Sequence, residues 1–209
     1  MPHYDMYMKT LAYKKMNAEI HEVFERVRSM AGDTKTIWLI YLRAVAQTTP
    51  LGNPYAMEKA YEGYSLFPTD DTIFTLYRIL TYGQQRVLEA EKLFNQGSSS
   101  YGQRDFVAAS NYFMQAFDKD PLNYAYSLDS GLALYENKSF EEAAKYFDLT
   151  LNSKRKDNAE RALRFKGLSL VNLGELSKAC AVFNKLKNQY PKRMYQQEFQ
   201  KYCFRSNNN

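Results

Sequence analysis

Glycine, alanine and phenylalanine recur in step along the second half of this chain. Alanine follows each glycine by twelve residues, and phenylalanine follows each alanine by four. The three sets are Gly97, Gly131 and Gly167; Ala109, Ala143 and Ala179; and Phe113, Phe147 and Phe183. The step is 34 and then 36 residues. A period of this length is the signature of stacked two-helix units, so it predicts an array of helix pairs.

The composition agrees with a helical array that builds its own core. The chain has 209 residues, of which 45% are hydrophobic and 24% charged, and its long segments show the 3.6-residue spacing of helices with no sustained alternation. The longest strongly apolar stretch, residues 37–42, is far shorter than the roughly 18 to 20 residues that span a bilayer, so no membrane span is expected. The first residues lack the apolar run of a signal peptide, which predicts a cytoplasmic protein as written. A fragment of a larger or exported protein stays open as an alternative.

Charge and cysteine usage narrow the classes of partner and cofactor. Residues 1–100 are neutral in sum, residues 101–153 carry a net charge of −4 and residues 154–209 one of +9. The two cysteines form no CxxC pair, and Cys180 is predicted to be a small buried side chain on a helix. With only His3 and His21 available, no metal site is predicted, and no sequence pattern points to any other cofactor.

The first half of the chain is predicted to be a helical region, residues 1–89, which includes one degenerate repeat at about 37–69. We expect helices over residues 4–30, over 34–47 with Asp33 or Thr34 as the cap, and over 53–67 after an Asn53-Pro54 start. Thr69 or Asp70 caps a further helix. The proline-free stretch that follows is either one long helix or, as we favour, two helices with a break near Gly83.

In the second half, three repeats cover residues 90–123, 124–159 and 160–193. Their helix pairs are predicted at 90–102 with 105–118, 123–136 with 140–152, and 158–172 with 176–189. Ser139 and Glu142 have the spacing of a capping box. The last segment, 193–209, is predicted to be a capping helix with a polar tail.

The repeated residues suit the crossing of two antiparallel helices. Small side chains at the crossing let the helices approach closely, so glycine and alanine are expected to face each other. The phenylalanines lie one turn further along the same face, and we expect them to fill the space toward the next unit.

This pattern resembles the tetratricopeptide repeat, which combines a small residue in the first helix with alanine, an aromatic residue and a closing proline in the second. The first repeat also has Leu93, Ala116 and Pro121 in register, and the third has Leu163 and Pro191. The resemblance covers about 100 residues. It implies an all-α, right-handed solenoid of antiparallel helix pairs that acts as a non-enzymatic scaffold for another protein. No catalytic residues are predicted.

The resemblance also implies a peptide-binding groove on the first helices of the pairs. The corresponding positions are Phe94, Asn95, Ser98, Tyr101, Leu128, Asp129, Leu132, Tyr135, Arg161, Arg164, Phe165 and Leu168. Family members that bind the carboxyl tail of heat-shock chaperones use lysine, asparagine and arginine at five such positions. Here these positions are Phe94, Ser98, Asp129, Arg161 and Phe165, which argues against a chaperone-tail ligand because Asp129 would repel a carboxylate.

A second candidate surface is the basic C-terminal end. Its residues are Lys154, Arg155, Lys156, Lys185, Lys187, Lys192 and Arg193. They would suit a nucleic acid or a ribonucleoprotein, and a solvated outer face is the simpler interpretation. A secretion-type chaperone is a further alternative, and homo-oligomerisation is left open.

Overall fold

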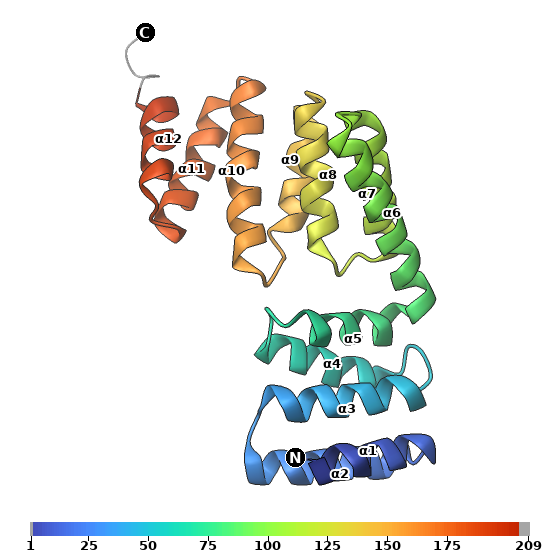
Figure 1. Ribbon diagram of the computed structural model, residues 1–209. Coiled ribbons are helices and arrows are strands. Elements are labelled where there is room, and N and C mark those ends of the chain that lie inside the picture. The colour runs from blue at the N-terminus through green and yellow to red at the C-terminus, as the bar shows by residue number, and fades with distance from the viewer. Residues whose placement is uncertain (1, 205–209) are drawn as a thin grey trace. The chain divides into compact units, whose positions relative to one another are not determined.

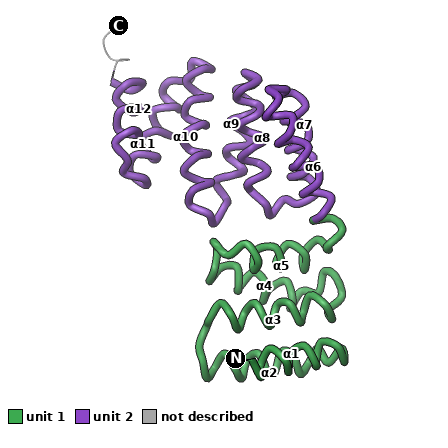
Figure 2. The backbone as a smooth tube through the Cα atoms, in the orientation of Figure 1, with its two compact units in different colours: residues 1–87 green, residues 88–209 purple. Residues whose placement is uncertain are grey.

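The computed structural model describes residues 2–204, and all regular secondary structure in this range is α-helical (Figure 1). The chain forms two compact units, residues 1–87 and residues 88–209, and the boundary falls within α6 (Figure 2). The helices are α1 (Pro2–Tyr13), α2 (Asn17–Ala31), α3 (Lys35–Thr48), α4 (Pro54–Leu66), α5 (Asp71–Tyr82), α6 (Gln84–Gly102), α7 (Phe106–Lys119), α8 (Tyr124–Glu136), α9 (Phe140–Thr150), α10 (Lys156–Asn172), α11 (Leu176–Gln189) and α12 (Arg193–Cys203).

Unit 1 is built around α3, which packs on α1, α2 and α5. Three aromatic side chains with no exposed surface, Phe24, Trp38 and Tyr41, form the centre of its core. The Phe24 ring stacks on Tyr41 at 3.8 Å between centroids and meets Trp38 edge-on at 4.8 Å. Large buried rings supply much of the apolar burial in a unit of this size.

The prediction of one helix over residues 4–30 is wrong, because the chain turns between Tyr13 and Asn17. Lys15 adopts a left-handed conformation with φ of 56°, and the Met16 amide donates to the Leu11 carbonyl. Neither glycine nor proline marks this turn. It separates α1 from α2, so that both can pack against α3.

The other predicted helix starts in unit 1 are confirmed, and the side-chain caps explain them. The Thr34, Asn53 and Asp70 side chains each accept a hydrogen bond from a backbone amide in the first turn of the helix that follows. Such a cap contributes about 1 kcal/mol. The break at Gly83 is also confirmed, with a φ of 85° that favours glycine.

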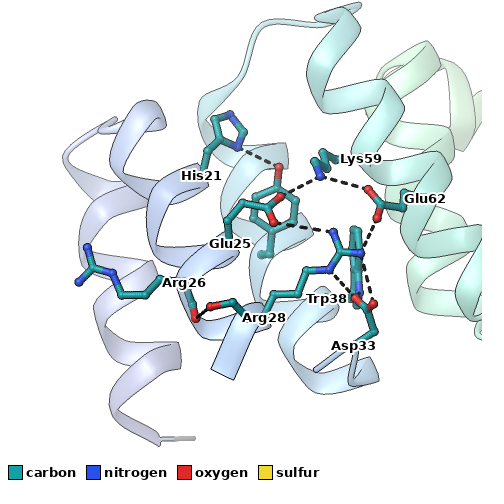
Figure 3. A network of polar contacts seen from close by, with 10 residues as sticks. His21, Glu25, Arg26, Arg28, Asp33, Trp38, Lys59 and Glu62 are labelled. Atoms are coloured by element: carbon teal, nitrogen blue, oxygen red, sulfur yellow. Dashed lines mark hydrogen bonds and ion pairs between the residues drawn. The ribbon is translucent and has the colours of Figure 1, made fainter. Parts of the chain in front are cut away.

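A network of charged side chains ties α2 to α4 above the core of unit 1 (Figure 3). The Arg28 guanidinium bonds Asp33 at 2.7 Å and Glu62 at 2.6 Å, and it lies over the Trp38 ring at 5.1 Å. Lys59 bonds Glu62 at 3.1 Å and also reaches α2. The hydrogen bond to Asp33 raises the pKa of Arg28 in spite of its burial.

The same network shifts the pKa of Asp33. Burial acts to raise the pKa of this carboxyl, but hydrogen bonds from Arg28 and Trp38 outweigh burial and hold the pKa below its ordinary value. The charges are satisfied by one another, so the network is a structural joint between helices. Arg28, Asp33, Lys59 and Glu62 are each paired within this network.

Unit 2 is a solenoid of antiparallel helix pairs, α6 with α7, α8 with α9, and α10 with α11, followed by α12 on α11. The predicted pairs lie within two residues of the observed helices, except that α6 begins at Gln84, six residues before the predicted start. The predicted capping box is wrong: Ser139 precedes α9, but its hydroxyl makes no cap. The Ser139 hydroxyl instead accepts a hydrogen bond from the Asn137 amide group at 3.3 Å.

The periodic glycines of unit 2 face the periodic phenylalanines of their own pairs. A Cβ placed on Gly97, Gly131 or Gly167 would lie 2.6 to 2.7 Å from the ring of Phe113, Phe147 or Phe183, respectively. The ring, which was not expected there, is thus the nearest neighbour of each glycine. Phe147 also stacks on Phe165 of α10, and Phe183 on Tyr202 of α12, which confirms for these two rings that phenylalanine fills the space toward the next unit. Each ring occupies the space that a Cβ on the glycine would need, so the glycine permits the close spacing within the pair.

The cysteines also depart from expectation. Cys180 on α11 and Cys203 on α12 form a disulfide, with Cα atoms 5.5 Å apart. Cys180 is half-buried, so its prediction as a small buried side chain without a partner is wrong. The bond fastens the last helix of unit 2 to the third helix pair, beside a stacked contact between Phe183 and Tyr202.

Candidate functional site

The first helices of the three pairs, α6, α8 and α10, contribute to one cavity of about 240 Å³ in unit 2. Five of the twelve predicted groove positions line it: Ser98, Tyr101, Asp129, Leu132 and Arg161. These residues are far apart in sequence. The glycine–phenylalanine contacts hold the helices at a spacing that places them together.

Phe113 of α7 completes the lining, and the sequence analysis missed it. Its position in the repeat marked it only as a packing residue, and it is indeed 3% exposed. Gly97 lies against the Phe113 ring and has no side chain of its own, so the Phe113 ring can line the cavity at this position. The sequence signal that could have identified Phe113 is Gly97 itself, because a glycine in the middle of a helix often lies against a large side chain of the neighbouring helix.

Asp129 is the one acidic residue among the side chains that line this cavity. Burial raises its pKa from the ordinary value of 3.8 to about 6, and the nearby positive charge of Arg161 acts in the opposite direction. Among residues 2–204, no hydrogen bond or ion pair within 4.0 Å reaches the Asp129 carboxylate. Asp129 is half-buried, so its carboxylate loses part of its hydration without a bonded partner among the described residues.

Tyr101 forms a half-buried wall of the cavity. Its ring meets Phe106 edge-on at 5.2 Å, which fixes its orientation. Burial raises the pKa of the Tyr101 hydroxyl, and the negative charges of Glu136 and Asp129 raise it further. The Tyr101 hydroxyl therefore stays neutral and can donate a hydrogen bond at any physiological pH.

A second aromatic group lies further along α8 and α10. Tyr135 meets Phe165 edge-on at 5.4 Å, and Phe165 also lies 6.0 Å from Phe147 in a stacked arrangement. Both Tyr135 and Phe165 are half-buried, so each packs against the core and keeps part of its surface accessible.

The remaining predicted groove residues differ in their burial and in their partners. Leu128 is 1% exposed and belongs to the core, so its prediction as a groove residue is wrong. Arg164 is bound to Glu198 of α12 at 2.7 Å, which ties down its charge. Asn95 is exposed, whereas the last two residues are half-buried against core clusters: Phe94 and Leu168.

The basic residues of the C-terminal end do not all present a free charge. Lys192 forms an ion pair with Glu160, and the Lys187 ammonium lies 4.2 Å from the centre of the Phe199 ring. Arg155 is half-buried. The others are exposed on the surface: Lys154, Lys156, Lys185 and Arg193.

A larger groove lies elsewhere, between α1 and α2 of unit 1, with a volume of about 790 Å³. It is a shallow surface trough whose lining includes Tyr7 and Met6, which are 52% and 63% exposed. Of its charged residues Glu19, Glu22 and Arg26, the last two are paired with each other at 2.7 Å. We place the candidate site in the smaller cavity, because five predicted groove residues from three successive helix pairs line it.

In residues 2–204, no cluster of three or more histidine, cysteine, aspartate or glutamate side chains is arranged to hold a metal ion. No described helix combines the length and apolar character that crossing a bilayer requires.

Comparisons with known proteins identify the repeat. A sequence model of the tetratricopeptide repeat matches residues 94–160, whereas no curated protein sequence matches the chain. Among solved structures, the N-terminal domain of stress-induced protein-1 (STI-1) from C. elegans is similar with a TM-score of 0.51 and 18% identity, over 56% of this chain and 96% of that one. The Arabidopsis OM64 TPR domain gives a TM-score of 0.50 and 17% identity, over 56% of this chain and 99% of that one. Residues 94–160 therefore carry the tetratricopeptide repeat pattern, and the similar solved structures have the corresponding helical fold.

Proposed function

We propose that unit 2 is a non-enzymatic interaction module that holds a peptide or helical segment of another protein along α6, α8 and α10. A tetratricopeptide fold is typical of protein-interaction scaffolds. The observation that carries the proposal is the cavity itself, because it unites side chains of three successive repeats at one place. Recognition by a few buried anchors is the usual source of affinity for an ordered segment.

The lining suits a peptide better than a small-molecule substrate. A volume of about 240 Å³ is below the roughly 300–1,000 Å³ of typical small-molecule sites. The accessible edges of Tyr135 and Phe165 continue the surface beyond the cavity along α8 and α10. A segment that crosses several repeats would contact both places.

The basic residues of the C-terminal end give no support to nucleic-acid binding as a second function. Lys192 is paired with Glu160 and Lys187 with the Phe199 ring, so part of its charge is already satisfied within the chain. A nucleic-acid role, which depends on many free cations, gains no support from this arrangement.

The function can be tested by selecting binders from displayed short peptides of random sequence with the full chain as bait. We expect bound peptide to slow amide hydrogen exchange in α6, α8 and α10. Ser98→Tyr places bulk at the cavity from an exposed position and should abolish binding.

The matched control is Ser99→Tyr, because Ser99 is the next residue of α6, is also exposed and does not line the cavity. Equal loss of binding in both variants, or protection confined to other helices, would contradict the proposed function.

A further inference from the structure

The cavity on α6, α8 and α10 has two chemically different parts. Its apolar part is formed by Phe113 and Leu132, which are 3% and 9% exposed. Its polar part is the Asp129 carboxylate, with the Tyr101 ring beside it. A long side chain with an aliphatic stem and a polar tip would match both parts at once.

The Asp129 carboxylate requires a donor that the described chain does not supply. Arg161 also lines the cavity, but it is exposed and lies beyond ion-pair distance from the carboxylate. Burial keeps the pKa of Asp129 at about 6, so the group is charged at neutral pH while it lacks a counter-charge in contact. A half-buried carboxylate that faces a cavity can gain a charge-assisted hydrogen bond from a cation bound there.

Resting on the function proposed above, we infer that the cavity receives the side chain of a lysine or arginine residue of the bound segment. The stem lies on Leu132 and Phe113, and the cationic tip bonds the Asp129 carboxylate. The Tyr101 ring adds a cation–π contact within its usual range. The cavity volume of about 240 Å³ has room for such a side chain.

Other side chains satisfy the site less well. An apolar side chain of equal length would fill the stem region and leave the carboxylate desolvated without a partner. An acidic side chain would meet Arg161 but would also bring a second carboxylate close to Asp129. The region that contains Asp129, residues 101–153, has a net charge of −4, which favours the approach of a basic segment.

The test uses peptides selected with the full chain and compares forms that differ only at one basic residue. We expect replacement of the anchoring lysine by norleucine to weaken binding at least about tenfold, since a hydrogen bond to a charged group is lost. In Asp129→Asn, the lysine and norleucine forms should bind within roughly threefold of each other.

The control variant is Asp157→Asn, which removes one exposed negative charge from α10 without touching the cavity. It should keep the full preference for lysine. Equal affinity of the lysine and norleucine forms for the unaltered chain overturns the inference, as does a preference for glutamate.

The two proposals fail in different ways. If peptides bind, lose affinity in Ser98→Tyr and yet show no dependence on a basic residue or on Asp129, the inference is wrong while the proposed function stands. If selected peptides are insensitive to Ser98→Tyr as well, the groove function itself is wrong, and the inference falls with it.

Discussion

Gly131 of α8 and Phe147 of α9 lie in direct contact, and a Cβ on the glycine would stand 2.6 Å from the Cε1 atom of the ring. Real Cβ atoms do not come so close to a ring carbon. The same contact recurs in all three helix pairs of unit 2. In unit 1, a Cβ on Gly63 would stand 2.7 Å from the Cε3 atom of Trp38. In that last contact the aromatic residue is on the earlier helix and the glycine on the later one.

Gly131→Ala should therefore destabilise the middle helix pair through overpacking. Phe147 has no exposed surface and cannot move aside, so we expect a loss of about 1–3 kcal/mol, and more for Gly131→Leu. Thermal and urea unfolding measure the loss. Gly102→Ala is the control, because a Cβ there meets nothing within 4 Å. An unchanged melting temperature in Gly131→Ala would contradict the packing described above.

The Cys180–Cys203 bond should stabilise the attachment of α12. A disulfide across 23 residues of chain restricts the unfolded state, and Cys203→Ser should lower the free energy of unfolding by about 3 kcal/mol. Unfolding with and without reductant measures this, and the reductant should have no further effect on the variant. Because disulfides persist in oxidising surroundings, the redox state of this pair in cells is also a direct test of the cytoplasmic prediction.

Asp129→Asn should raise stability at neutral pH. The pKa of Asp129 is raised from 3.8 to about 6, so between these values the folded state binds the extra proton and stability falls as pH rises. At about 1.4 kcal/mol for each pKa unit, the penalty above pH 6 is at most about 3 kcal/mol, and residual solvent access reduces it. Melting of both proteins at pH 7.5 and pH 4 measures the difference, which should nearly vanish at the lower pH. A variant that is less stable at pH 7.5 would show that the carboxylate is compensated.

Binding of a lysine-containing peptide should have the opposite dependence on pH. Protonation of Asp129 removes its charge, so affinity should fall as pH drops through about 6. Arg161 and Tyr101 also face this carboxylate, and burial raises the pKa of the Tyr101 hydroxyl, which stays neutral in this range. Titration by fluorescence anisotropy at pH 7.5 and pH 5 measures the effect. In Asp129→Asn the affinity should be the same at both values, and a persisting pH effect would assign it to another group.

Arg28 should contribute far more to unit 1 than its neighbour Arg26. Arg28 has a side-chain exposure of 23% and bonds carboxylates on two sides, so Arg28→Met should cost about 1–3 kcal/mol by leaving them unpaired. Arg26 is 63% exposed in a single pair with Glu22, and Arg26→Met should cost less than about 1 kcal/mol. Equal losses in urea unfolding would show that the network is no stronger than a surface pair.

Much of unit 2 could be predicted because its cues are local or periodic. The 34- and 36-residue steps placed three helix pairs, and capping residues such as Asp70 placed helix starts in unit 1. The turn at Lys15 escaped prediction, since a lysine in a left-handed conformation carries no sequence signal. The five groove positions that meet at the cavity were predicted from the repeat register, whereas Phe113 was not.

The sequence by itself determined the helical class, the repeat and its register, because helix formation and pair stacking depend on residue spacing along the chain. Only the tertiary structure decided that phenylalanine rather than alanine covers glycine, that Cys180 pairs with Cys203, and that Asp129 stands without a partner. These contacts join residues on different helices. Their distances depend on how closely the helices approach, which no spacing within one helix reveals.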